Sequence, residues 1–368
     1  MTAPDAGASR VSGHNDLMRA VVFDQFSARP DVREVEEPTP PPGGVVVRVE
    51  STGLCCSDVH GWLGHDDGIA LPHVPGHELV GRIAALGKGV TRFAAGDRVT
   101  TPFVCACGRC PECAAGNGQV CRNQTQPGFT HWGSFAESVA LHDADTNLIA
   151  VPETLDAGAA ALLGCRFATS YRGLVHQAQL LSGEDLVVVG CGGVGLSAVM
   201  IGVALGAHVT AVDIDDAALA RAARFGAART VNTRGLSRAE TLTSLSDAAP
   251  DGFHVSVDAL GREATAAVGI LSLKPRGRHV QIGLFPSDPV VPMGAVIGRE
   301  LSILGSHGMP ARDYPGLMDL VFTGQLRPQD LIERRITLDD VPDALLAMAG
   351  DRSAGGVTVV DVGAASLQ

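Results

Sequence analysis

The chain has 368 residues, a formal net charge of −12 and nine cysteines. This length allows two domains that each bury a core of their own, and the acidic balance argues against nucleic acid or an anionic membrane as a partner. An odd number of cysteines without a signal-peptide pattern argues against a secreted disulfide framework, so we expect a cytoplasmic protein with reduced, metal-binding thiols.

The first predicted elements belong to a strand-rich domain. Residues 1–17 are small, polar and aperiodic, and we expect them to form a flexible tail. From residue 18 to residue 166, short β-branched runs alternate with Pro and Gly clusters, which is typical of a barrel-like domain. The expected strands are 18–23, 45–49, 79–85 and 97–101.

Residues 167–305 have a different sequence pattern, in which predicted helices alternate with apolar strands. Such alternation builds a parallel sheet covered by helices, and the expected strands are 186–189, 209–212, 254–258, 279–283 and 301–305. Residues 306–368 return to mixed helix and strand, and a last strand at 357–362 is expected to complete the first domain. The predicted fold class is therefore α/β, with one strand-rich domain and one doubly wound parallel sheet.

An uncharged apolar stretch at 186–207 is long enough to span a membrane, but its glycines would break a helix. They fit a strand, a tight turn and a new helix, which is the dinucleotide-binding pattern. The loop supplies Gly190, Gly192, Gly193, Val194 and Gly195. In this pattern the first glycine permits the turn, the second lets the backbone approach a pyrophosphate, and the third packs the helix on the strand.

Asp213 stands at the end of the next expected strand, where an acid can hydrogen-bond the adenosine ribose. Asp215 and Asp216 follow it. Because this acidic cluster would repel a 2′-phosphate, the sequence predicts NAD rather than NADP as the coenzyme. An ordinary strand–turn–helix with incidental glycines is the alternative interpretation.

Two sets of cysteines predict two zinc sites. The first set lies in one Gly- and Pro-rich loop and consists of Cys107, Cys110, Cys113 and Cys121. Four thiolates close a tetrahedral shell on zinc and leave no position for a substrate, so this site is predicted to be structural. The second set is dispersed and combines Cys55, His77 and Cys165, three ligands that leave a fourth position open and therefore predict a catalytic zinc.

With these motifs in place, nearly the whole chain resembles the zinc-dependent medium-chain alcohol dehydrogenases. The resemblance implies a GroES-like catalytic domain at 18–166, completed by 306–368, and a Rossmann coenzyme domain at 167–305. It implies that Cys55, His77 and Cys165 bind the catalytic zinc, with Glu78 behind the metal as an alternate ligand. It also implies a homodimer or homotetramer, for which the strand at 301–305 is a candidate edge.

The same resemblance implies a proton path and a substrate cleft. Ser57 would accept the alcohol proton, His60 would pass it to solvent, and Asp58 would orient His77. An imidazole titrates near neutral pH, which suits such a relay. Trp62 and Trp132 would lie beside the substrate and favour an apolar or planar one, although a plain core role is the alternative for both.

Four positions depart from the family pattern. Cys56 stands where many relatives have a basic residue that touches the coenzyme pyrophosphate, and Ala218 stands where NAD-users often carry a lysine. The segment 355–359 lacks an arginine that often faces the pyrophosphate. Arg166, beside Cys165, is unusual for the family and is predicted to supply the missing charge; a surface salt bridge is the alternative.

The function predicted from these motifs is reversible hydride transfer between a primary or secondary alcohol and NAD, with two zinc ions per chain. A reductase of the same fold that acts on a conjugated double bond is the first alternative. A non-catalytic zinc and dinucleotide binder is the second. The presence of Ser57 and His60 favours the alcohol dehydrogenase, because a proton relay would be idle in either alternative.

Overall fold

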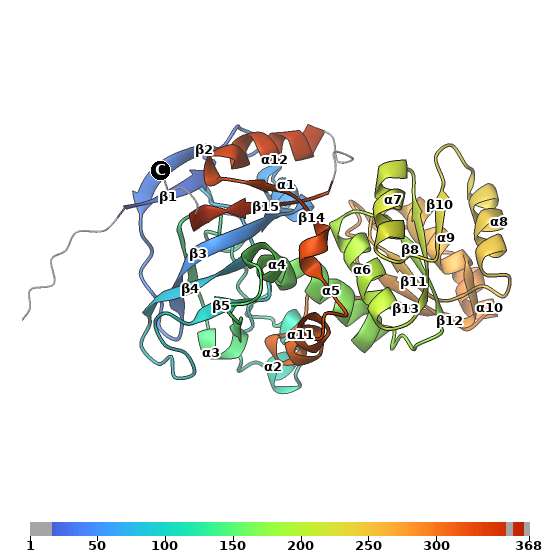
Figure 1. Cartoon of the computed structure of the whole chain (residues 1–368), viewed down its shortest axis with the longest axis horizontal. Coiled ribbons are helices and arrows are strands. Elements are labelled where there is room, and N and C mark those ends of the chain that lie inside the picture. The colour runs from blue at the N-terminus through green and yellow to red at the C-terminus, as the bar shows by residue number, and fades with distance from the viewer. Residues whose placement is uncertain (1–16, 351–355, 364–368) are drawn as a thin grey trace, which may run out of the picture.

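The computed structural model describes residues 17–350 and 356–363. The predicted tail therefore lies outside the described residues, apart from Leu17, which begins the first strand. The chain forms two lobes, one built on a mixed sheet and the other on a parallel sheet, and helices join the lobes in the middle (Figure 1).

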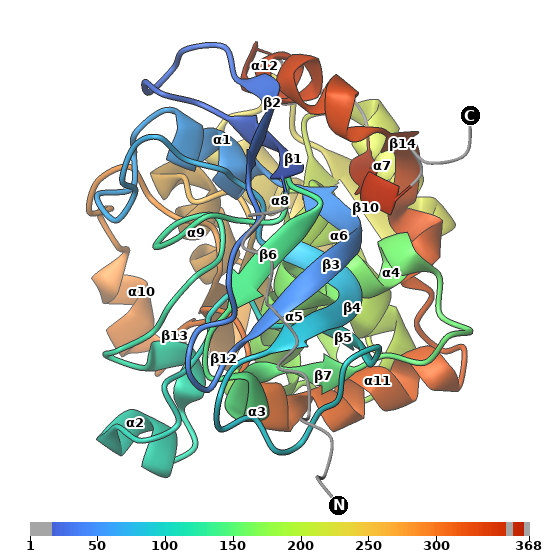
Figure 2. The same ribbon diagram turned by 90° about the vertical axis from the view of Figure 1, so that its left-hand side faces the viewer.

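The first lobe holds a mixed sheet with the strand order β14-β15-β3-β4-β5-β7, in which β6 also pairs with β3, and a separate pair β1-β2. Their bounds are β1 (Leu17–Val22), β2 (Asp31–Glu36), β3 (Val45–Leu54), β4 (Glu78–Leu86), β5 (Arg98–Thr100), β6 (Ser138–Leu141), β7 (Ile149–Ala150), β14 (Ile332–Ile336) and β15 (Val357–Asp361). As predicted, the last strand returns to this lobe, where Thr358 lies opposite Leu54. Figure 2 shows β3, β4 and β6 from this side.

The second lobe is a six-stranded parallel sheet with the order β10-β9-β8-β11-β12-β13. In chain order this is 3-2-1-4-5-6, the order of the Rossmann fold. The strands are β8 (Asp185–Val189), β9 (His208–Asp213), β10 (Arg229–Asn232), β11 (Phe253–Asp258), β12 (Leu273–Gln281) and β13 (Ser302–Gly305). The helices of this lobe are α6 (Gly193–Ala204), α7 (Asp216–Arg224), α8 (Arg238–Ala248), α9 (Glu263–Leu271) and α10 (Met293–Gly298).

Most predicted strands of both lobes are confirmed, and five observed strands were not predicted: β2, β6, β7, β10 and β14. The apolar stretch at 186–207 contains β8, a turn and α6, and no helix in residues 17–350 and 356–363 is long and apolar enough to cross a membrane. The unpredicted strand of the parallel sheet is β10, a short edge strand in which Arg229 and Thr230 are exposed. An edge strand of this kind has no alternating apolar pattern by which it could be found.

One helical run passes between the two sheets and carries residues of the candidate site (Figure 1). It consists of α4 (Ala157–Leu162), η2 (Leu163–Phe167), α5 (Ala168–Tyr171) and η3 (Arg172–Gln177). The turns η2 and η3 have the wider π-helical form, which is often found at functional sites. The predicted domain boundary at residue 166 falls inside this run, so the helix belongs to both lobes.

The remaining helices lie in or beside the first lobe. They are α1 (Cys56–Trp62), α2 (Pro111–Ala114), η1 (Gly118–Val120), α3 (Ala144–Asn147), η4 (Ala311–Asp313), α11 (Tyr314–Phe322), η5 (Pro328–Leu331), η6 (Leu338–Asp340) and α12 (Val341–Gly350). Helix α1 begins directly after β3, and α12 packs against it. The first turn of α1 therefore lies at the carboxyl end of β3, and this end of the mixed sheet faces the second lobe.

Candidate active site

The dispersed ligand set comes together where β3, β4 and η2 meet. Cys55 follows β3, and His77 precedes β4, in which Glu78 lies opposite Gly53 of β3. A Cβ atom on Gly53 would lie 2.2 Å from Glu78 Oε2, so glycine is needed at this position. Cys165 reaches the same point from η2.

The ligand atoms of Cys55, His77, Glu78 and Cys165 all lie within 4.8 Å of one another, and all four residues are buried. His77 donates a hydrogen bond from Nδ1 to Asp58 Oδ1 at 2.9 Å, which leaves Nε2 as a lone-pair acceptor. This Nε2 atom is buried and has no hydrogen-bond partner among the described residues. An orphaned imidazole nitrogen beside two thiols is the donor set that zinc prefers, so the residues fit a zinc ion.

Asp58 holds this arrangement in place through three hydrogen bonds. Its carboxylate accepts the backbone N–H of Cys55 at 2.8 Å and that of Gly76 at 3.2 Å, in addition to His77 Nδ1. These bonds fix both the ring orientation and the tautomer of His77, as carboxylates commonly do for metal-binding histidines. The structure thus brings Asp58 to the place where it was predicted.

The two thiols of the set are electrostatically coupled. A hydrogen bond from Cys165 lowers the pKa of the Cys55 thiol well below its ordinary value, and His77 and Arg166 act in the same direction against the effect of burial. A thiolate is therefore favoured at Cys55, and a thiolate is the form that binds metal.

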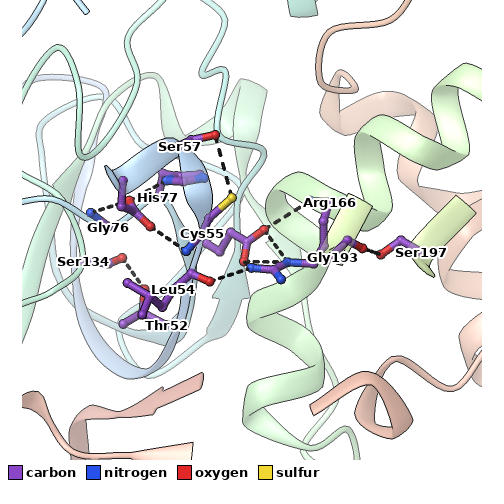
Figure 3. Close-up of polar contacts among 12 residues, drawn as sticks. Thr52, Leu54, Cys55, Ser57, Gly76, His77, Ser134, Arg166, Gly193 and Ser197 are labelled. Atoms are coloured by element: carbon purple, nitrogen blue, oxygen red, sulfur yellow. Dashed lines mark hydrogen bonds and ion pairs between the residues drawn. The ribbon is translucent and has the colours of Figure 1, made fainter. Parts of the chain in front are cut away.

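Glu78 and Arg166 form a buried ion pair (Figure 3). The Nε and Nη2 atoms of Arg166 donate to the Glu78 carboxylate at distances between 2.6 and 3.1 Å, and Nη2 also donates to the Leu54 carbonyl at 3.1 Å. The Arg166 side chain is only 4% exposed. The alternative of a surface salt bridge is therefore wrong, because this pair lies inside the site.

Ser57 and His60 stand on the first turns of α1. Sγ of Cys55 lies 3.8 Å from Ser57 Oγ, which places this hydroxyl beside the metal ligands (Figure 3). The Nδ1 atom of His60 lies 2.9 Å from Nδ1 of His65. His65 was not among the predicted site residues, although it follows His60 by five positions in the chain.

The four loop cysteines form the second metal-binding group. Their sulfur atoms lie within 4.8 Å of one another, with Cys110 Sγ 3.4 Å from Cys113 Sγ and 3.6 Å from Cys121 Sγ. These separations are too long for a disulfide bond of about 2.05 Å. They approach the separation of about 3.8 Å that four zinc–sulfur bonds of about 2.3 Å impose in a tetrahedron.

The glycine loop has the geometry of a phosphate cradle. Gly190 adopts φ +94°, and a Cβ atom on Gly195 would lie 1.7 Å from the Gly190 carbonyl, so the turn and the helix contact both require glycine. At Gly192 a Cβ would meet no atom within 4 Å, which leaves the open space that a pyrophosphate needs. Val194 lies in the first turn of α6. Asp213 accepts the Cys191 N–H at 2.6 Å and thereby joins the loop to β9.

Comparison with known proteins decides the family. Residues 41–153 match the alcohol dehydrogenase GroES-like domain, and residues 193–323 match the zinc-binding dehydrogenase domain. An alcohol dehydrogenase of Moraxella sp. is 33% identical over 88% of this chain and 94% of its own length. The chain belongs to the zinc-dependent medium-chain alcohol dehydrogenase family. It is thus an oxidoreductase with the GroES-like and Rossmann architecture.

Two further members of the family show its range. An L-threonine 3-dehydrogenase of Rhizobium etli is 28% identical over 94% of this chain and 99% of its own length. The solved structure of an alcohol dehydrogenase from Thermus sp. ATN1 superposes with a TM-score of 0.84 at 30% identity, over 94% of this chain and all of that one. Membership of this family therefore establishes that the chain is a dehydrogenase.

Within this zinc-dependent dehydrogenase, the two tryptophans have their main contacts in the hydrophobic core. Trp62 is 5% exposed and donates from Nε1 to the Ala28 carbonyl at 2.6 Å. Trp132 packs against the same core and donates to the Pro72 carbonyl at 3.0 Å. Their placement beside a substrate stays a prediction.

Proposed function

We propose that this chain is a zinc-dependent alcohol dehydrogenase that transfers hydride reversibly between a primary or secondary alcohol and NAD. The observation that carries the proposal is the buried convergence of Cys55, His77 and Cys165, with a His77 Nε2 atom that has no hydrogen-bond partner in the described part of the chain. Three protein ligands leave a fourth position for a substrate oxygen. A zinc ion bound there would supply a Lewis acid that polarises this oxygen.

The chain's own residues would handle the proton. Ser57 Oγ, placed beside the Cys55 sulfur, would take the alcohol proton, and His60 would release it to solvent. Asp58 would keep His77 in the tautomer that presents Nε2. Cys107, Cys110, Cys113 and Cys121 would bind a second, structural zinc, which gives two ions per chain.

Arg166 and the glycine loop support the coenzyme assignment. The Nη1 atom of Arg166 would lie 2.6 Å from a Cβ on Gly193, so this guanidinium reaches the N-terminus of α6. We infer that it supplies the charge that the family more often places at 355–359, and that it contacts the pyrophosphate. Asp213, Asp215 and Asp216 support NAD over NADP because they would repel a 2′-phosphate.

The edge of the parallel sheet supports a homodimer or homotetramer. Strand β13 pairs with β12 on one side, and it carries the exposed Ile303. Neighbouring α10 exposes Ile297, at 74% of its surface. An apolar edge strand of this kind is a template for a second copy of the chain.

The test combines metal analysis with turnover. Zinc is measured per chain, and NADH formation is followed by absorbance with primary, secondary, allylic and benzylic alcohols. We expect about two zinc ions per chain and turnover that is lost in Cys165→Ser but kept in Cys105→Ser, which alters a buried thiol outside both clusters. Two zinc ions and bound NAD without turnover of any alcohol or carbonyl would contradict the proposal and favour the double-bond reductase or the binding protein.

A further inference from the structure

Four polar side chains form a ladder inside the parallel sheet, beneath helix α9. Ser256 and Asp258 lie on β11, and they pair in register with His279 and Gln281 of β12. Ser256, Asp258 and His279 are each at most 1% exposed. A Cβ atom on Gly269 of α9 would lie 3.1 Å from His279 Cε1, so the helix closes directly over the imidazole. Polar groups buried this deeply must satisfy one another.

The hydrogen bonds of this polar ladder all run in one direction. Gln281 Nε2 lies 3.1 Å from Asp258 Oδ2 and 2.8 Å from the Gly283 carbonyl, and both of these oxygens accept. The amide oxygen of Gln281 therefore faces His279 Nε2 at 3.2 Å, and this nitrogen must carry a proton. Burial lowers the pKa of His279, so the ring is neutral near pH 7. Its Nδ1 atom then accepts from the Ser256 hydroxyl at 2.8 Å.

The ladder ends on Asp258, which fixes the loop between β11 and α9. Its carboxylate accepts the backbone N–H of Leu260 at 2.8 Å and that of Gly261 at 3.3 Å. It also accepts the Thr265 hydroxyl at 3.2 Å. A buried carboxylate is strongly penalised when it loses a donor. The orientation of the Gln281 amide therefore affects how firmly Asp258 holds the loop.

This loop, residues 259–262, packs against the turn that is predicted to receive the phosphates. A Cβ atom on Gly190 would lie 2.5 Å from Leu260 Cγ, so the leucine side chain lies directly against the first glycine of the turn. A Cβ atom on Gly195 would lie 3.4 Å from Ala259 Cβ. The loop therefore contacts both positions at which the turn and α6 require glycine. Because glycine contributes no side chain, the packing of its neighbours sets the position of the turn.

We propose that His279 and Gln281 are positioning residues for the coenzyme. They orient the Asp258 carboxylate, which holds loop 259–262 against the glycine turn in the place that a pyrophosphate requires. His279 is too deeply buried to contact the coenzyme and acts through its neighbours alone. The inference rests on the proposed binding of NAD, because only a dinucleotide makes the exact placement of this turn important for function.

The test measures NADH affinity by NADH fluorescence in two variants that separate hydrogen bonding from packing. His279→Gln keeps a donor for the Gln281 amide oxygen, whereas His279→Leu removes the donor and keeps an apolar side chain under α9. We expect His279→Leu to weaken NADH binding about tenfold, because one buried polar group loses its partner. His279→Gln should retain most of the parent affinity, and both variants should retain their zinc.

A matched control uses the same substitution at an exposed histidine. His208 begins β9, at the end of the parallel sheet opposite the glycine turn, and its side chain is 68% exposed. His208→Leu should therefore bind NADH as the parent does. A loss of affinity in this control equal to that of His279→Leu would overturn the assignment to the polar ladder.

A second readout examines the direction of the hydrogen bonds without coenzyme. Nitrogen-15 NMR of the zinc-loaded protein can report the tautomer of His279, whose signals are identified by their loss in His279→Gln. We expect a protonated Nε2 atom and a bare Nδ1 atom. The opposite tautomer would overturn the inference, because Gln281 would then have to turn its amide nitrogen away from Asp258.

The outcomes separate this inference from the proposed function. Equal NADH affinity of His279→Leu and the parent would overturn the inference and leave the dehydrogenase intact. Equal weakening in His279→Gln and His279→Leu would also overturn it, because the shape of the ring, and not its hydrogen bonds, would then position the turn. A parent protein without affinity for NADH would overturn the proposed coenzyme and this inference with it.

Discussion

Replacing Arg166 by Met should destabilise the first lobe strongly, because it strands a buried carboxylate. Glu78 is fully buried and would keep only its bond from the Arg166 backbone N–H, at 3.2 Å. Burial already raises the pKa of Glu78 against the opposing charge of Arg166, so without the guanidinium the carboxyl should take up a proton. Starting from an ordinary pKa of 4.5, this protonation at pH 7 costs about 3.4 kcal/mol, since one pKa unit is worth about 1.36 kcal/mol.

This cost agrees with the roughly 3–5 kcal/mol found when one partner of a buried pair is removed. The assay is urea unfolding at constant zinc, followed by the fluorescence of Trp62 and Trp132, which both lie in the first lobe. The double variant Arg166→Met with Glu78→Gln is the matched control, because it removes the stranded charge. It should recover most of the loss. A loss below about 1 kcal/mol in the single variant, or no recovery in the double variant, would refute the reasoning.

The same Arg166 variant tests the coenzyme assignment independently. Arg166 Nη1 points toward Gly193, and a charge-assisted hydrogen bond to a phosphate is worth about tenfold or more in affinity. NADH fluorescence should therefore show weaker binding by Arg166→Met. Unchanged affinity in protein that retains its zinc would contradict a contact between Arg166 and the pyrophosphate.

Three further predictions concern other parts of the molecule. Asp58→Asn should weaken zinc binding by about tenfold to a hundredfold, as a competing chelator would show; equal retention by parent and variant would contradict this. Burial lowers the pKa of His131 to about 4. The neutral ring therefore stabilises the fold fully above its ordinary pKa of about 6.5, and about 3 kcal/mol of this stability is lost as the pH falls to 4. Urea unfolding of His131→Gln should lack this loss, and an identical pH dependence would disprove it. Ile303→Lys on β13 should reduce the mass in size-exclusion chromatography with light scattering; a monomeric parent would refute the assembly proposal.

Local patterns explain how much of the fold and site the sequence could predict. The turn before α6 requires glycine at position 190, and the close contact between α6 and this turn requires glycine at position 195. Because both positions lie in one short segment, the sequence shows them as a motif. Cys107, Cys110 and Cys113 are likewise close together in the chain. Strands β8 and β9 of the parallel sheet were found because burial on both faces makes their central residues apolar.

Contacts between distant segments left no such pattern. Arg166 was noticed as an unusual neighbour of Cys165, but its pairing with Glu78 depends on how η2 packs against β4. The motifs therefore predict the chemistry that the family shares, whereas the buried ion pair of Arg166 and Glu78 arises from packing between segments that are distant in the chain.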